Sequence, residues 1–383
     1  MRIASILLCT ILLFSLTACS PAEKPQPVPT ETTQIPQTTA PETQPPTTLP
    51  PDPIETLLEG LSIEERVGQL FLARCEDATA LEDIEAYHLG GYVLFGGDFD
   101  GQTPASIREK LQGYQAAAKL PLLIAVDEEG GTVTRISRYP AFREMPFPSP
   151  RNALKNWGME GVMTVEEEKC QLLTSLGINV NLGPVCDIAT DPSAFMYARS
   201  LGQDAEVTGS FVSQVVSLMN TYHLGSVLKH FPGYGNNPDT HTGMARDSRT
   251  LSELESNDLL PFAAGIQAGC GGILVSHTIV EALDPEAPAS LSPAVHAYLR
   301  DHLGFDGVIL TDDLVMQAIT DAYGAGEAAV LAVLAGNDLL CSTEYPVQYE
   351  AVLAAVLEGR ISFDTLNEAV RHVLGWKMEL GLL

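Results

Sequence analysis

Short apolar runs alternate with segments of helical length from about residue 54 to the C-terminus. The runs occupy 91–95, 122–126, 180–184, 227–228, 272–275, 308–310 and 338–341, and helix-length segments between them include 106–119, 207–222, 258–268, 292–303 and 327–335. Continuous apolar strands separated by helices indicate a parallel sheet covered by helices. With roughly seven or eight units, we predict an α/β fold, a single TIM-like (β/α)8 barrel. A doubly wound open sheet is the alternative, weakened because no GxGxxG follows a strand.

The first helix of this region has a recognisable start. Ser62 is a candidate N-cap, and Glu65 follows three residues later, which is the pattern of a capping box. Val67, Leu70 and Phe71 then continue with the apolar spacing of a helix.

The N-terminal residues predict export and anchoring. Arg2 precedes a short apolar run at 6–14, and Leu-Thr-Ala comes before Cys19. This resembles the lipobox of bacterial lipoproteins, so we expect a signal peptide over 1–18 and a diacylated Cys19. Ordinary secretion with an incidental cysteine is the alternative. The resemblance implies an extracytoplasmic protein that is lipid-anchored to the cell membrane.

Residues 19–53 follow as a linker rich in Pro, Thr and Gln. Such a segment buries too little apolar surface to fold, so we expect a disordered tether. The folded domain is expected over 54–383.

Composition narrows the classes of partner. A formal net charge of −28 argues against nucleic acid. The hydrophobic content of 45% supports a substantial core. No CxxC or metal-ligand spacing occurs, so we predict neither a metal nor another cofactor. Cys186, Cys270 and Cys341 lie in apolar runs and are expected to be buried. No pattern predicts an oligomeric state.

Titratable residues gather where the predicted strands end. Residues 226–247 begin as a strand and break into a loop with Lys229, His230, Asp239 and His241. A strand followed by such a loop is how a barrel enzyme presents catalytic groups. A polar surface loop is the alternative.

Other strand ends carry the same signal. Asp127 and Arg135 follow one strand, Arg199 lies beyond another, and Asp312 with Asp313 closes a third. Successive strand residues point to opposite sides, so we expect only one of the paired aspartates to face the barrel mouth and the other to be structural.

A carboxylate opposite an Asp–His pair indicates glycoside cleavage. One group acts on the sugar ring and the other donates a proton to the leaving oxygen. A histidine serves as donor when an aspartate orients it. This chemistry needs no metal.

Together these residues resemble glycoside hydrolase family 3, and in particular its β-N-acetylhexosaminidase branch. The matching segments are 126–131, 177–185, 229–233, 239–241, 289–292 and 304–316. The resemblance covers about 54–383. It implies a TIM-like barrel and retaining cleavage of β-linked N-acetylglucosamine.

The resemblance also implies roles for individual residues. Asp312 is the expected nucleophile, His241 the general acid/base and Asp239 its orienting partner. The expected sugar subsite consists of Asp127, Arg135, Arg199, Lys229 and His230. The family's β-glucosidases usually take their acid from a second domain, whereas this chain ends soon after the last expected barrel helix, which favours the histidine as donor.

One loop departs from the family pattern. The family usually has a histidine where this chain has Tyr234, and the stretch before Asp239 differs by about one residue in length. Both catalytic residues are kept, but rate and leaving-group preference are put in question.

The sequence thus predicts an exo-acting β-N-acetylglucosaminidase that takes an N-acetylglucosaminide, from peptidoglycan fragments or other cell-surface glycans. Within enzymes, a family 3 β-glucosidase or an N-acetylglucosaminide phosphorylase is the alternative. A non-catalytic sugar-binding lipoprotein is the alternative of another class.

Overall fold

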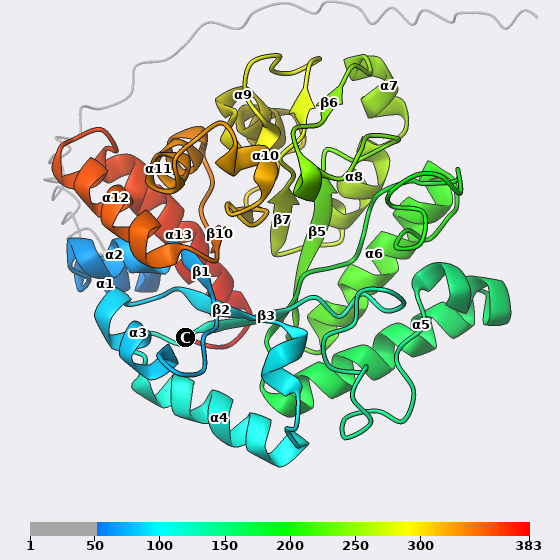
Figure 1. Ribbon diagram of the computed structural model, residues 1–383, viewed down its shortest axis with the longest axis horizontal. Coiled ribbons are helices and arrows are strands. Elements are labelled where there is room, and N and C mark those ends of the chain that lie inside the picture. Colours follow the sequence, from blue (N-terminus) through cyan, green and yellow to red (C-terminus); the bar gives the residue numbers. More distant parts are fainter. Residues whose placement is uncertain (1–51) are drawn as a thin grey trace, which may run out of the picture. The chain divides into compact units, whose positions relative to one another are not determined.

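The computed structural model describes residues 52–383 (Figure 1). The predicted signal peptide, the lipidation site Cys19 and nearly all of the linker lie outside the described residues. Within the described part, no helix is long and apolar enough to cross a bilayer.

Eight parallel strands form a nearly closed barrel, which confirms the predicted fold class (Figure 1). The strands of the barrel follow the order β10-β1-β2-β3-β4-β5-β7-β9. The two ends of this order meet at a parallel bridge between Leu310 and Leu339, where the Thr311 N–H donates to the Leu339 carbonyl across 3.2 Å. The open-sheet alternative is therefore wrong. The strands are β1 Phe71–Arg74, β2 Gly91–Leu94, β3 Leu123–Val126, β4 Val180–Asn181, β5 Gly225–Phe231, β6 Arg246–Asp247, β7 Gly272–Val275, β8 Ile279–Val280, β9 Val308–Thr311 and β10 Leu340–Ser342.

Helices surround this barrel. They are α1 Pro53–Glu59, α2 Ile63–Gln69, α3 Ala80–Tyr87, α4 Pro104–Ala117, α5 Pro150–Leu176, α6 Ala205–Thr221, α7 Leu251–Ser256, α8 Leu259–Gln267, α9 Pro293–Ala297, α10 Gln317–Thr320, α11 Ala325–Ala335, α12 Tyr345–Leu357 and α13 Phe363–Glu379, with short 3-10 or π turns η1 Gly96–Phe99, η2 Thr240–Thr242, η3 Ala289–Leu291 and η4 Tyr298–His302.

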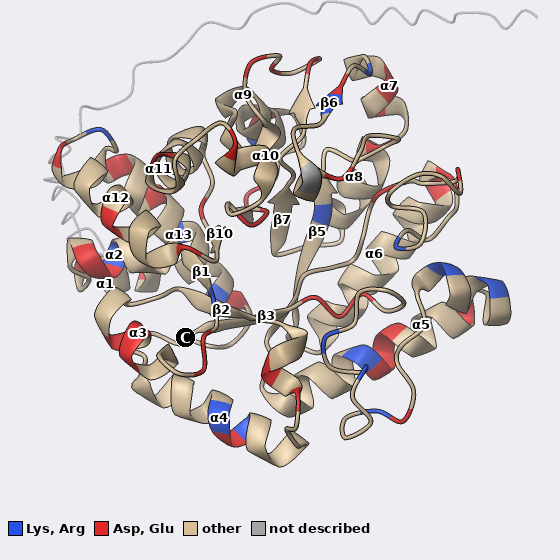
Figure 2. Cartoon of the chain, in the orientation of Figure 1, with Lys and Arg blue, Asp and Glu red and all other residues tan. Residues whose placement is uncertain are grey.

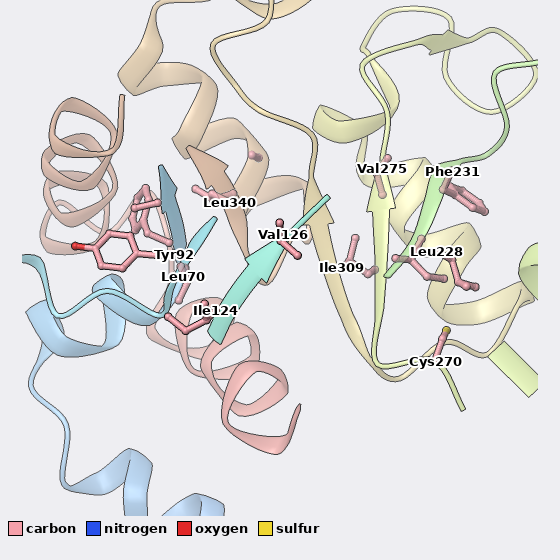
Figure 3. Packing of buried hydrophobic residues seen from close by; sticks show 14 of the residues in the cluster. Leu70, Tyr92, Ile124, Val126, Leu228, Phe231, Cys270, Val275, Ile309 and Leu340 are labelled. Carbon is pink, nitrogen blue, oxygen red and sulfur yellow. The ribbon is translucent and has the colours of Figure 1, made fainter. Parts of the chain in front are cut away.

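Two apolar layers hold the barrel together. Side chains such as Ile124, Val126 and Leu228 point outward and pack under the helices (Figure 3). Their neighbours, among them Leu123 and Val227, point into the barrel, where Trp376 of α13 joins them. This alternation follows from the two-residue period of a strand. The filled interior leaves the carboxyl ends of the strands as the place for a site.

The helix start at Ser62 is as predicted, but its end is not. Ser62 Oγ accepts from the Glu65 N–H at 3.2 Å, and the Ser62 N–H donates to Glu65 Oε2 at 2.8 Å. The expected continuation of the helix to Phe71 is wrong, because α2 ends at Gln69 and Phe71 begins β1. The cysteines expected to be buried are buried, and all five in the described residues are free thiols.

Charge is distributed unevenly over the domain. Acidic positions are spread over many helices and loops, whereas basic positions include α4, α5 and the interior strand β5 (Figure 2). Burying a basic residue on a barrel strand costs free energy unless a carboxylate pairs with it. Lys229 on β5 therefore indicates that negative charge lies close by.

Candidate active site

A pocket of about 550 Å³ opens where the carboxyl ends of the barrel strands meet. All eight residues predicted for the site line it, namely Asp127, Arg135, Arg199, Lys229, His230, Asp239, His241 and Asp312. The structure therefore brings together residues that are far apart in the sequence.

The barrel topology explains this convergence. Asp127 follows β3, Lys229 and His230 lie near the end of β5, and Asp312 follows β9. Because parallel strands present their carboxyl ends on one side, residues at equivalent strand ends face a common mouth. The remaining members come from the loops that connect these strands to the helices.

Lys229 is fully buried and lies between two carboxylates. Its Nζ is 2.6 Å from Asp127 Oδ1 and 2.6 Å from Glu129 Oε1. Glu129 also receives two hydrogen bonds from Arg199, at 2.9 Å from Nε and 2.7 Å from Nη2. Burial opposes ionisation of Glu129, but Lys229 and Arg199 outweigh it and hold the pKa of this carboxyl well below its ordinary value.

Arg135 stands at the edge of this network. Its Nη2 is 3.6 Å from Asp127 Oδ2, too long for a hydrogen bond, and its guanidinium lies over the Phe95 ring, 5.4 Å from the centroid. Asp127 is thus tied firmly on one side by Lys229 and only loosely on the other.

His230 is held from both ring nitrogens. Nδ1 lies 2.8 Å from Asp187 Oδ2, and Arg199 Nη2 lies 3.2 Å from Nε2. The other Asp187 oxygen accepts the Tyr234 N–H at 2.7 Å. Asp187 therefore connects the end of β5 to the loop that follows.

Asp312 is a half-buried carboxylate in the pocket lining. Burial alone would raise its pKa, but His277, His230, the Asp313 N–H and His241 together lower the pKa below its ordinary value. The Asp313 N–H donates to Asp312 Oδ1 at 2.9 Å. A carboxylate whose pKa is shifted in the lining of a pocket is a candidate for a functional role.

His277 supports the same corner. Its Nε2 donates to the Asp313 carbonyl at 3.0 Å, and its Nδ1 accepts from Ser290 Oγ at 2.7 Å. Burial lowers the pKa of His277, which keeps the ring neutral.

Asp313 also borders the pocket, so the expectation that only one of the two aspartates faces the mouth is only partly met. Its carboxylate accepts from Thr343 Oγ1 at 2.6 Å, from the Thr343 N–H at 3.2 Å and from the Val315 N–H at 3.1 Å. These bonds give Asp313 a structural task, because they fasten β10 to the turn after β9.

Asp239 and His241 form the predicted pair. Asp239 Oδ1 lies 2.6 Å from His241 Nδ1 and accepts the His241 N–H at 2.9 Å. The His241 side chain is 59% exposed. With Nδ1 directed at the aspartate, Nε2 is the atom left to reach a substrate.

Two acids that the sequence reasoning did not place in the site are Glu129 and Asp187. Glu129 is the last of three consecutive acids at 127–129, and the sequence does not show which of the three gains basic partners. The signal available in the sequence is that Glu129 lies two residues after Asp127, a spacing that places both side chains on the same side of an extended segment. Asp187 follows β4 closely, and its position after a strand was the only hint. No cluster of three or more His, Cys, Asp or Glu side chains in 52–383 is arranged to hold a metal ion.

Comparisons with known proteins show the family to which the chain belongs. The glycosyl hydrolase family 3 N terminal domain matches residues 62–375. A β-hexosaminidase of Xanthomonas campestris is 33% identical over 300 residues, which cover 75% of this chain and 87% of that protein.

Two solved structures are similar as well. A family 3 β-N-acetylglucosaminidase from Paenibacillus is 31% identical with a TM-score of 0.77, and the match covers 84% of this chain and 63% of that one. A β-N-acetylhexosaminidase from Beutenbergia cavernae is 29% identical with a TM-score of 0.72, and the match covers 83% and 99% of the two chains. The chain therefore belongs to glycosyl hydrolase family 3 and is a glycoside hydrolase.

Proposed function

We propose that this protein is a retaining exo-β-N-acetylglucosaminidase that hydrolyses terminal β-linked N-acetylglucosamine. The observation that carries the proposal is that one pocket contains an ionised Asp312 and the Asp239–His241 pair beside a charged subsite. The relatives named β-hexosaminidase and β-N-acetylglucosaminidase support the choice of sugar.

The pocket suits one terminal sugar unit. Its volume of about 550 Å³ is within the range of small-molecule sites. Asp127, held by Lys229 on one side, accepts hydrogen bonds from ring hydroxyls, while Arg135, Arg199 and His230 contact other hydroxyls or the acetamido group. The charged groups already neutralise one another, so a neutral sugar binds without leaving a buried charge unpaired.

Cleavage proceeds in two steps. First, an Asp312 carboxylate oxygen attacks the anomeric carbon, the glycosidic C–O bond breaks, and His241 Nε2 gives its proton to the departing oxygen. Then a water attacks the same carbon, His241 Nε2 takes its proton, and the bond to Asp312 breaks. Asp239 orients the ring and stabilises its protonated form during each transfer.

The source of the substrate follows from the predicted location. A protein anchored outside the cell through Cys19 meets peptidoglycan fragments and other cell-surface glycans. This part of the proposal rests on the sequence features of residues 1–53.

The test compares purified wild type with Asp312→Asn on para-nitrophenyl N-acetyl-β-glucosaminide and para-nitrophenyl β-glucoside. We expect preferential cleavage of the N-acetyl substrate by wild type, release of the β-anomer first, and no turnover by Asp312→Asn. Preference for the glucoside would contradict the choice of N-acetylglucosamine as the sugar. Sugar phosphate formed only when phosphate is present would identify a phosphorylase. Binding of N-acetylglucosamine without cleavage of either substrate would identify a sugar-binding lipoprotein.

A further inference from the structure

The loop that carries Asp239 and His241 is fastened at its tip to a side chain at its root. Tyr234 lies three residues beyond the end of β5, and Thr240 lies between the two members of the pair. Tyr234 Oη is 2.5 Å from Thr240 Oγ1, and both side chains are buried. The position of Thr240 sets the backbone from which both Asp239 and His241 project.

The root of this loop is rigid. The Tyr234 N–H donates to Asp187, and the Tyr234 ring packs edge-on against His230, with centroids 5.3 Å apart. Arg249 Nη2 donates to the Gly233 carbonyl at 2.8 Å and is itself paired with Asp247. Tyr234 is thus a fixed point from which the tip can be held.

The tip of the loop, which carries Asp239 and His241, needs a contact that fixes it over the pocket. The bonds between Asp239 and His241 orient the imidazole on its partner, but they act between residues two apart in η2. These bonds do not determine where the pair lies relative to the pocket, so other contacts must supply this placement. Thr240 and the packing of η2 against α10 supply it.

A phenol also differs chemically from the histidine that the family usually has at this position. Burial, and then the negative charge of Asp312, raise the pKa of Tyr234, so its hydroxyl remains neutral throughout the working pH range. An imidazole here would change its charge near neutral pH.

We propose that Tyr234 is a positioning residue, which acts through Thr240 to hold the Asp239–His241 pair over the pocket. The expected effect on catalysis rests on the proposed function. It predicts a specific defect: loss of the bond impairs the proton donation to the leaving group more than it impairs sugar binding.

Leaving groups provide the measurement. A methoxide leaves only with a proton from His241, whereas a dinitrophenolate leaves without one. The value of kcat/KM reports the first bond cleavage, so a misplaced proton donor lowers it for methyl N-acetyl-β-glucosaminide and spares the dinitrophenyl glycoside.

The experiment uses Tyr234→Phe, Thr240→Val and the double variant. Tyr92→Phe is the matched control, because it removes another buried tyrosine hydroxyl, which donates to the Ala80 carbonyl at 2.8 Å away from the pocket. We expect each single variant to lose roughly three- to tenfold in kcat/KM on the methyl glycoside, with no further loss in the double variant. Equal losses on both substrates, or losses that multiply in the double variant, would overturn the proposal.

Hydrogen exchange separates this proposal from the proposed function. Amides of 235–243 are expected to exchange faster in Tyr234→Phe than in wild type and Tyr92→Phe. If wild type cleaves neither glycoside, the proposed function fails, while faster exchange still supports the tether. Unchanged exchange in Tyr234→Phe overturns the tether whatever the activity.

Discussion

Arg199 selects the tautomer of His230: its Nη2 lies 3.2 Å from the imidazole Nε2. Arginine has donors only, so Nε2 must accept and carries no proton. The remaining ring proton is then on Nδ1, which donates to Asp187 Oδ2 at 2.8 Å. The two contacts therefore define one tautomer of His230, with the proton on Nδ1 and the lone pair of Nε2 facing Arg199.

Replacing Asp187 by asparagine should disturb this tautomer. Asp187 accepts from the His230 N–H, from His230 Nδ1 and from the Tyr234 N–H, whereas an asparagine has a single accepting oxygen. Losing bonds to a charged acceptor costs about 1.5 to 3 kcal/mol, so we expect kcat/KM on an N-acetylglucosaminide to fall roughly 10- to 100-fold. The measurement combines kinetics with nitrogen NMR of the histidine rings.

The matched control is Asp191→Asn, an exposed aspartate in the same loop that bonds only locally, to Ser193. It should leave kinetics and ring signals unchanged. An Asp187→Asn variant with wild-type histidine signals would contradict the assigned tautomer.

Removing the charge of Glu129 should destabilise the fold. Glu129→Gln leaves the largely buried Arg199 guanidinium without its ion-pair partner and takes one of two carboxylates from Lys229. Breaking a buried ion pair from one side costs about 3 to 5 kcal/mol. Urea unfolding at neutral pH measures the change in the free energy of unfolding. The exposed pair of Glu327 and Arg360 is the control, and Glu327→Gln should have little effect.

The difference in the free energy of unfolding between wild type and Glu129→Gln should become smaller in acid. Because Lys229 and Arg199 hold the pKa of Glu129 below its ordinary value despite burial, the unfolded chain binds the extra proton first as the pH falls. The stabilisation is complete above about pH 4.5 and declines below it by about 1.4 kcal/mol per pH unit. The gap between wild type and Glu129→Gln should therefore narrow from pH 5 towards about pH 3. A constant gap would show that folding does not lower the pKa of Glu129.

The barrel was predictable because its strands are buried on both faces and read as uninterrupted apolar runs. The site was predictable for a related reason: a parallel barrel brings all strand ends to one mouth, so Asp127, Lys229 and Asp312 meet without any contact being known beforehand.

Boundaries and partners were harder to predict. Phe71 continues the apolar spacing of α2 yet begins β1, since its pairing with Leu340 depends on a strand from the far end of the chain. Likewise, Glu129 gains its role from Lys229 and Arg199, which only the fold places beside it. Tertiary contacts of this kind leave no local pattern in the sequence.

Lys377 tests the free-energy cost of burying an ammonium group whose hydrogen bond is to a neutral amide oxygen. Its ammonium is fully buried in α13, its Nζ is 2.6 Å from Gln69 Oε1, and burial lowers its pKa to about 7. The unfolded chain holds this proton up to about pH 10.5, so the penalty is absent above that value, grows as the pH falls, and is complete below about pH 7. Lys377→Met should therefore be more stable than wild type at pH 7, by a few kcal/mol at most, and the gain should shrink by about pH 10.

Lys169→Met should have the opposite effect on stability. Lys169 is also buried, but it pairs with Glu166 at 2.7 Å and donates to the Glu129 carbonyl at 2.9 Å. Its removal leaves a buried carboxylate alone, so this variant should be less stable than wild type. If urea unfolding ranked both methionine variants on the same side of wild type, the distinction between the two lysines would be wrong.

Azide should separate the two tasks proposed for His241. In His241→Ala the glycosyl group is still transferred to Asp312 from a dinitrophenyl glycoside, which leaves unaided, but water then attacks without a base, so turnover should drop about 100- to 10,000-fold. Azide is a nucleophile that has no proton to lose. It should restore kcat and release the β-glycosyl azide, whereas Asp312→Asn, which cannot form the intermediate, should gain nothing. Rescue of both variants would point to direct attack of azide on bound substrate. Rescue of neither would remove His241 from the base role and leave its exposed position beside Asp239 without a catalytic explanation.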